Sequence, residues 1–101
     1  MNNSKSTQIK NIVAKIDISK IIAYSQEYPK SKTLRQIASY IEKAQQTNND
    51  QEIFKMGVNI AYHLDSICDP NKAGYVKNEA ERKHWLAISH ELFKNTVGIK
   101  E

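Results

Sequence analysis

The chain has 101 residues, the length of one domain, and carries a net charge of +4 with 40% hydrophobic and 26% charged residues, a composition typical of folded proteins. Three glycines and two prolines are too few for the turns of a many-stranded fold, so helices joined by short connections are favoured. One cysteine excludes an internal disulfide, and no apolar run exceeds four residues, so we expect a cytoplasmic protein without a signal peptide or a membrane span.

The first helix is expected over residues 7–16, where apolar side chains share one face at helical spacing: Ile9, Ile12, Val13 and Ile16. The apolar pattern then moves to nearly the opposite side, so a straight helix as far as Tyr28 would be apolar on two faces. We therefore expect a break near Asp17, with Asp17 or Ser19 capping a second segment. The alternative is that the first ten residues fray and only residues 11–28 are helical. Residues 1–6 are expected to be disordered.

The next helix has a clearer start. Pro29 ends the preceding element, because the residue before a proline is pushed out of the helical region. The stretch "TLRQ" has the form of a capping box, in which Thr33 accepts from the helix amides and Gln36 reaches back. This pattern predicts a helix from Thr33 to about Gln46.

Two further cap patterns open the remaining helices. Asn49 with Glu52 precedes the most apolar segment of the chain, and Asn78 with Glu81 follows a loop over residues 69–77. Together the segments predict an all-α fold, an antiparallel four-helix bundle whose first helix is broken near Asp17, in one domain over residues 1–101.

The stretch "AYHLDSICDP" at residues 61–70 resembles a metal or acid–base site. On a helix, however, His63 and Cys68 are about 140° apart and cannot reach the same ion from one face. We therefore expect Cys68 to be a core residue, His63 to lie at the core boundary, and Asp69 to end the helix before a turn. Asp65 lies at the rim of the apolar face, where a carboxylate usually finds a lysine or a backbone amide.

No catalytic pattern is recognisable. His84 and His90 flank the last apolar arc about 120° apart, and no G-x-S-x-G or similar frame accompanies them. The three glycines are isolated, so there is no glycine-rich phosphate loop. We predict a protein that is not an enzyme and that uses no cofactor and no metal.

The positive charge is concentrated in the N-terminal third. Residues 1–35 hold seven basic side chains and two acidic ones. The candidate basic patch consists of Lys10, Lys15, Lys20, Lys30, Lys32 and Arg35. Because the first lysines recur every five residues, they would spread around a helix, so a solvated basic segment competes with nucleic-acid binding.

Two tyrosines have no evident place in the core: Tyr62 projects from the polar side of its helix, and Tyr75 lies in the long loop. Tyrosine is enriched at interfaces because it combines contact area with a polar tip. The candidate partner-contact residues are Tyr62, Tyr75, Lys77, His90 and Lys94.

The layout of the whole chain, from "IKNIVAKI" to "WLAISHELF", resembles the small cytosolic immunity proteins that protect producers of pediocin-like (class IIa) bacteriocins. The resemblance lies in length, basic charge and the succession of helices. It implies an antiparallel four-helix bundle, a membrane receptor complex approached from the cytoplasm as the partner, and specificity in the C-terminal segment, residues 84–101.

The function we expect is therefore non-catalytic: binding to, and inhibition of, another protein, with bacteriocin immunity as the specific hypothesis. Three alternatives remain open. They are a phage- or plasmid-encoded inhibitor of a host or defence protein, a nucleic-acid-binding accessory protein that uses the basic N-terminal third, and a small enzyme. The oligomeric state does not follow from the sequence.

Overall fold

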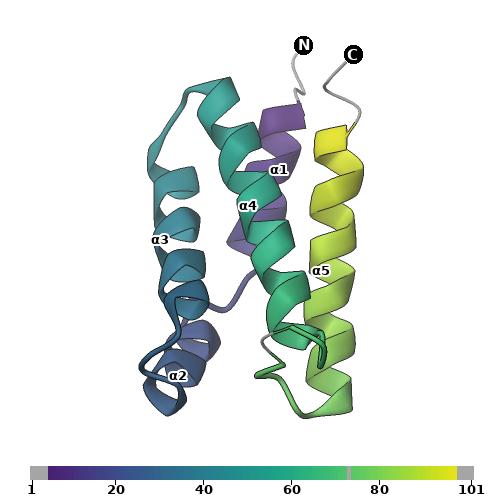
Figure 1. Cartoon of the computed structure of the whole chain (residues 1–101). Coiled ribbons are helices and arrows are strands. Elements are labelled where there is room, and N and C mark those ends of the chain that lie inside the picture. The colour runs from purple at the N-terminus through teal and green to yellow at the C-terminus, as the bar shows by residue number, and fades with distance from the viewer. Residues whose placement is uncertain (1–4, 73, 98–101) are drawn as a thin grey trace.

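A computed structural model describes residues 5–72 and 74–97 of the chain (Figure 1). These residues form an all-α fold without strands. Its five helices are α1 (Lys5–Ala14), α2 (Ile18–Glu27), α3 (Lys32–Gln46), α4 (Asp50–Cys68) and α5 (Glu79–Val97). The predicted four-helix bundle is therefore not confirmed. The described residues form five helices, because the first predicted helix is divided into two separate elements.

The division between α1 and α2 lies at Asp17, where the shift in the apolar pattern predicted it. The Asp17 carboxylate accepts hydrogen bonds from the Ser19 amide at 3.1 Å and from the Ser19 hydroxyl at 2.5 Å, which caps α2. A continuous helix over residues 11–28 is therefore wrong. Lys5 and Ser6, which were expected to be disordered, begin α1, and the Ser6 hydroxyl donates to the Asp50 carboxylate at 2.8 Å. Residues 1–4 lie outside the described part.

The cap of α3 differs from the prediction. Ser31, not Thr33, is the N-cap, and its hydroxyl accepts from the Leu34 amide at 3.2 Å. The Ser31 amide donates to the Tyr28 carbonyl at 3.0 Å and closes a turn that contains Pro29. This turn places Ser31 in the capping position, two residues before the predicted cap at Thr33.

The other two predicted caps are confirmed. Asn49 accepts from the Glu52 amide at 3.0 Å, and Asn78 accepts from the Glu81 amide at 3.0 Å. The loop between α4 and α5 covers residues 69–78, one residue more than predicted.

Helix α4 is the centre of the fold, with α3 and α5 on either side of it and α1 behind (Figure 1). Gly57 allows this close packing, because a Cβ atom there would lie 3.0 Å from Ile9 Cγ2 and 3.4 Å from Thr96 Cγ2. The Ser89 hydroxyl donates to the Ala61 carbonyl at 2.9 Å and joins α5 to α4 inside the core. No helix of the described residues is long and apolar enough to cross a membrane.

Helix α2 is less closely packed than the other helices. Its backbone lies close to the backbone of α3 and not to that of any other described helix. It lies at the bottom of Figure 1, together with the α1–α2 break, the α2–α3 turn, the α4–α5 loop and the start of α5. We call this region the lower end. The molecule measures 41 × 22 × 19 Å along its principal axes. The upper end carries the start of α1, the α3–α4 turn and the last turns of α5.

Candidate functional site

A strip of apolar side chains that are only partly buried lies on α4 and α5. We call it the aromatic face, and it consists of Phe54, Val58 and Tyr62 on α4 with Leu86 and Phe93 on α5. The α4 members are spaced by four residues and therefore lie along one side of the helix. Tyr62 is 58% exposed, whereas the other four are half-buried. The Tyr62 and Phe93 rings meet edge to face, with centroids 5.2 Å apart.

Three of the predicted partner-contact residues lie on this side of the molecule. Tyr62 belongs to the aromatic face itself. His90 and Lys94 are exposed and lie one turn apart on α5, and His90 follows Leu86 by four residues, so both border the strip. The structure thus places three of the candidate residues on the same side of α4 and α5, which the sequence did not predict.

The other two candidates lie at the lower end. Tyr75 is half-buried and stacks on Tyr28 across the α2–α3 turn, with ring centroids 4.4 Å apart. Lys77 is exposed, and its carbonyl accepts from Arg82 Nη1 at 3.4 Å. Tyr62 and Tyr75 therefore do not form one surface, and Tyr75 has a packing role that its position in a loop did not indicate.

The cluster at residues 61–70 separates as helical geometry predicted. Cys68 is 3% exposed, and burial, reinforced by the Asp65 charge, raises the pKa of its thiol to about 11. His63 is half-buried, with Nε2 3.1 Å from Gln36 Oε1, and burial lowers its pKa. Asp65 pairs with Lys72 at 3.2 Å. The described residues contain no group of three His, Cys, Asp or Glu side chains able to hold a metal ion.

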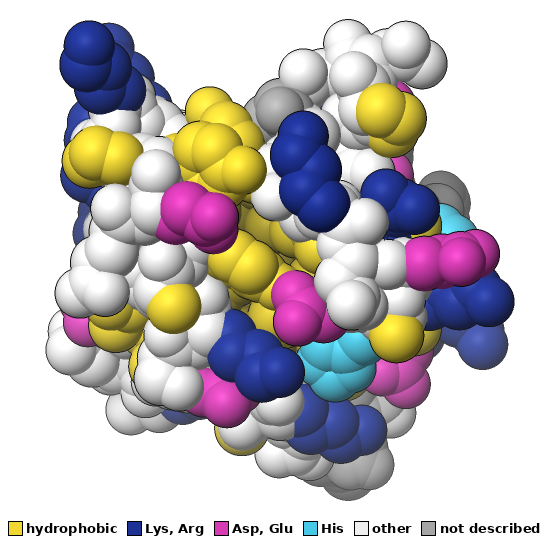
Figure 2. All heavy atoms as spheres, turned by 90° about the horizontal axis from the view of Figure 1, so that it is seen from below, with side chains coloured by type: hydrophobic (Ala, Val, Ile, Leu, Met, Phe, Trp, Pro, Cys, Tyr) yellow, Lys and Arg dark blue, Asp and Glu magenta, His cyan; other side chains and the backbone are white. Residues whose placement is uncertain are grey.

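The lower end is hollowed, as Figure 2 shows from below: apolar side chains form the floor, and charged side chains surround it. A pocket of about 410 Å³ lies there between the α1–α2 break and the start of α5. Its lining consists of Lys15, Asp17, Lys20, Ala80, Glu81, His84 and Trp85. The hollow arises because α2 diverges from α5.

Long side chains join α2 to α5 across this gap. Trp85 is fully buried, and its Nε1 donates to the Tyr24 hydroxyl oxygen at 3.2 Å. The Tyr24 hydroxyl in turn donates to the Glu81 carboxylate. Burial, followed by the hydrogen bond to Glu81, raises the pKa of Tyr24 to about 12. No local sequence signal could have found this network, since Tyr24 and Trp85 are 61 positions apart.

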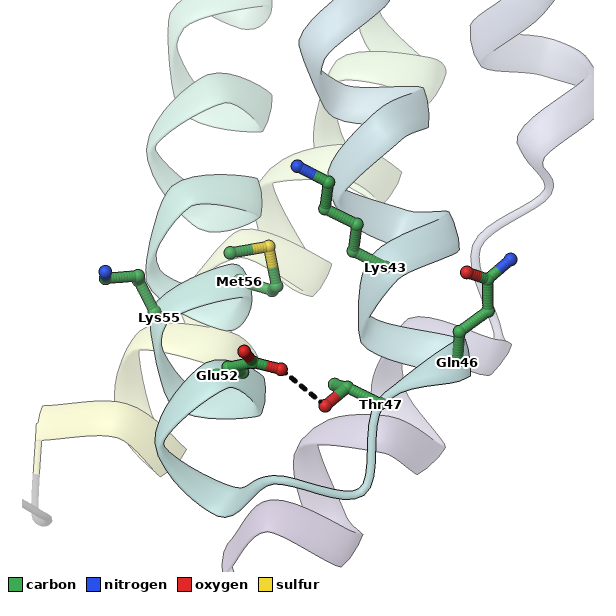
Figure 3. A pocket seen from close by; sticks show the side chains of 6 residues that line it. All are labelled: Lys43, Gln46, Thr47, Glu52, Lys55 and Met56. Atoms are coloured by element: carbon green, nitrogen blue, oxygen red, sulfur yellow. Dashed lines mark hydrogen bonds between the residues drawn. The ribbon is translucent and has the colours of Figure 1, made fainter.

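A second pocket, of about 490 Å³, lies at the upper end between the end of α3 and the start of α4 (Figure 3). The Thr47 hydroxyl donates to the Glu52 carboxylate at 2.6 Å, and the Thr47 carbonyl accepts from Lys10 Nζ at 3.0 Å. The ammonium groups of Lys43 and Lys55 do not converge in Figure 3. The polar groups of the turn are thus bonded to one another, and the lysines do not define a ligand position.

The predicted basic patch is divided between the two ends. Lys10 is engaged at the α3–α4 turn at the upper end. The other five members lie at the lower end: Lys15 and Lys20 line the hollow, and Lys30, Lys32 and Arg35 surround the α2–α3 turn. Arg35 Nη1 also donates to the Pro29 carbonyl at 2.6 Å.

Comparisons with protein-family models, with curated proteins and with solved structures found no match to this chain.

Proposed function

We propose that this protein is a non-catalytic binding protein that confers immunity to a pediocin-like bacteriocin, and that it contacts its protein partner through the aromatic face. The observation that carries the proposal is the exposure of Tyr62: it is 58% exposed and packs on Phe93, which itself is half-buried. A large aromatic side chain left in water beside further apolar surface is typical of a protein–protein interface.

The aromatic face has the composition of a binding hot spot. A tyrosine at the centre of a contact contributes a large apolar area with little conformational entropy to lose, and it is enriched among residues that dominate binding energy. His90 and Lys94 would lie at the polar rim, where charges influence association rate and specificity. The α5 half of the face falls within residues 84–101, where the resemblance to immunity proteins implies specificity.

The reactivity of the nucleophilic side chains also favours binding over catalysis. The Cys68 thiol is buried and has a pKa near 11, so it stays protonated at neutral pH and is a poor nucleophile. His84 packs edge-on against Trp85 at a ring distance of 4.7 Å, and His63 lies against the Tyr40 ring on α3. These histidines lie on different helices with aromatic neighbours, which is an arrangement for packing.

The direct test is expression of the chain in the cytoplasm of cells sensitive to pediocin-like bacteriocins. The expected result is survival at bacteriocin concentrations that kill cells carrying the empty vector. Affinity capture with the folded chain should then recover the membrane receptor complex that the bacteriocin targets. Unchanged killing across the class IIa bacteriocins, with the chain folded and abundant in the cells, would contradict the immunity proposal.

A further inference from the structure

The lower end gathers positive charge from separate parts of the chain. Nine cationic side chains belong to it: Lys15, Lys20, Lys30, Lys32, Arg35, Lys72, Lys77, Arg82 and Lys83. Six carboxylates lie in the same region, namely Asp17, Glu27, Asp65, Asp69, Glu79 and Glu81. The fold thus brings the basic residues of segment 15–35 together with those of the α4–α5 loop and of α5, which are distant in sequence.

The cations of this end are largely unpaired. Four of the six carboxylates accept a hydrogen bond or an ion pair within the chain: Asp17, Asp65, Asp69 and Glu81. By contrast, the ammonium groups of six lysines make no hydrogen bond or ion pair with any residue that the structure describes: Lys15, Lys20, Lys30, Lys32, Lys77 and Lys83. These ammonium groups are available to an external anion.

Apolar and aromatic groups lie among these charges. Figure 2 shows the apolar floor of the hollow inside the ring of Lys, Arg, Asp and Glu side chains. Ile22 on α2 is 43% exposed, and the stacked Tyr28 and Tyr75 rings are half-buried at the same end. Lysines around tyrosine and aliphatic side chains are the combination found where proteins meet the interface of a bilayer.

We propose that the lower end binds the anionic surface of a lipid bilayer. The mixed ring of charges favours a bilayer over a nucleic-acid duplex, because lipids diffuse laterally: anionic headgroups can collect beneath the lysines while neutral ones lie beneath Glu27 and Glu79. A duplex presents fixed phosphates and would meet both signs of charge. The apolar floor also has a counterpart in the bilayer interface, whereas a phosphate backbone offers none. This inference does not depend on the proposed immunity function.

The test uses the full chain and vesicles of phosphatidylcholine, with or without an equal part of phosphatidylglycerol. The wild type should sediment with the anionic vesicles, and the binding should weaken with added salt because exposed charges are screened. Equal binding to both kinds of vesicle, or no binding to the anionic ones, would overturn the proposal. Tighter binding to a DNA or RNA duplex than to anionic vesicles at the same salt concentration would also overturn it, in favour of a nucleic-acid partner.

A matched pair of triple variants tests which end binds. Lys20→Gln, Lys30→Gln and Lys77→Gln remove three charges from the lower end, and Lys5→Gln, Lys43→Gln and Lys55→Gln remove three from the upper end. Because a lysine near an anionic surface is worth about a fivefold change in affinity, the lower triple should lose about a hundredfold. The upper triple should lose less than about tenfold. Equal losses would mean that only net charge matters and would refute binding by the lower end.

Trp85 reports the orientation of the bound protein, because it is the only tryptophan and it lines the lower-end hollow. Binding by the lower end predicts that anionic vesicles with nitroxide-labelled headgroups quench Trp85 fluorescence more than unlabelled vesicles do. Vesicle binding without any such quenching would place another surface on the membrane and would overturn the proposal. Circular dichroism of each variant establishes that the comparison is made between folded proteins.

Discussion

Replacing Tyr24 by Phe tests how α2 is held to the rest of the fold. The change removes one hydroxyl, which is the acceptor for the indole N–H of the fully buried Trp85 and a donor to Glu81. Because the backbone of α2 approaches only that of α3, this network is the main polar link between α2 and α5. A buried donor that loses its partner costs about 1–3 kcal/mol. Since the adjoining hollow admits water, we expect a loss of about 1–2 kcal/mol in the free energy of unfolding.

The assay is urea unfolding followed by circular dichroism, with thermal unfolding as a second measurement. For a domain of this size, each kcal/mol corresponds to a fall of about 4–8 °C in Tm. Tyr62→Phe is the matched control, because the Tyr62 hydroxyl makes no hydrogen bond with any described residue, and it should change stability by less than about 0.5 kcal/mol. The double variant with Trp85→Phe should show a coupling energy of at least about 0.5 kcal/mol. A Tyr24→Phe variant that is no less stable than Tyr62→Phe would show that the Tyr24 hydroxyl does not hold α2 in place.

Three further predictions concern the titrating and closely packed groups. Because the pKa of Tyr24 is raised from 10.0 to about 12 in the folded protein, its contribution to stability is complete below pH 10 and is lost as the pH rises toward 12; Tyr24→Phe should flatten this part of a stability–pH curve. The Cys68 thiol, with a pKa raised from 9.0 to about 11, should react with Ellman's reagent about a hundredfold more slowly in the native protein than in urea at about pH 8, and equal rates would contradict its burial. Gly57→Val should lower the free energy of unfolding by about 1–3 kcal/mol in urea titrations, since even the Cβ atom would approach Ile9 at 3.0 Å, whereas Gly57→Ala should cost less because alanine favours the helix.

Local signals in the sequence predicted most of the helices. The caps at Asn49 and Asn78 were identifiable because a cap involves only a few adjacent residues. The shift of the apolar pattern located the break at Asp17 for the same reason. The cap of α3 was misplaced because Ser31 and Thr33 are both capping residues within three positions of Leu34, and the turn at Pro29 decided between them.

Contacts between residues that are distant in the sequence could not be predicted from local sequence patterns. The exposure of Tyr62 followed from its position on the polar side of one helix and is confirmed. The stacking of Tyr75 on Tyr28 and the bond between Trp85 and Tyr24 depend on how α2 is placed, which periodicity does not encode. The lysine spacing predicted only that the charge is spread around a helix, and it could not show that the fold brings five of the six basic-patch residues to one end.

We propose that the aromatic face is the surface through which this protein acts. The most direct measurement is the survival of bacteriocin-treated cells that express Tyr62→Glu, compared with cells that express Gln45→Glu, which adds the same charge on the far helix α3. Both positions are exposed, so neither change should unfold the protein. We predict that Tyr62→Glu abolishes protection and that Gln45→Glu retains it. Full protection by Tyr62→Glu at wild-type expression would contradict the claim.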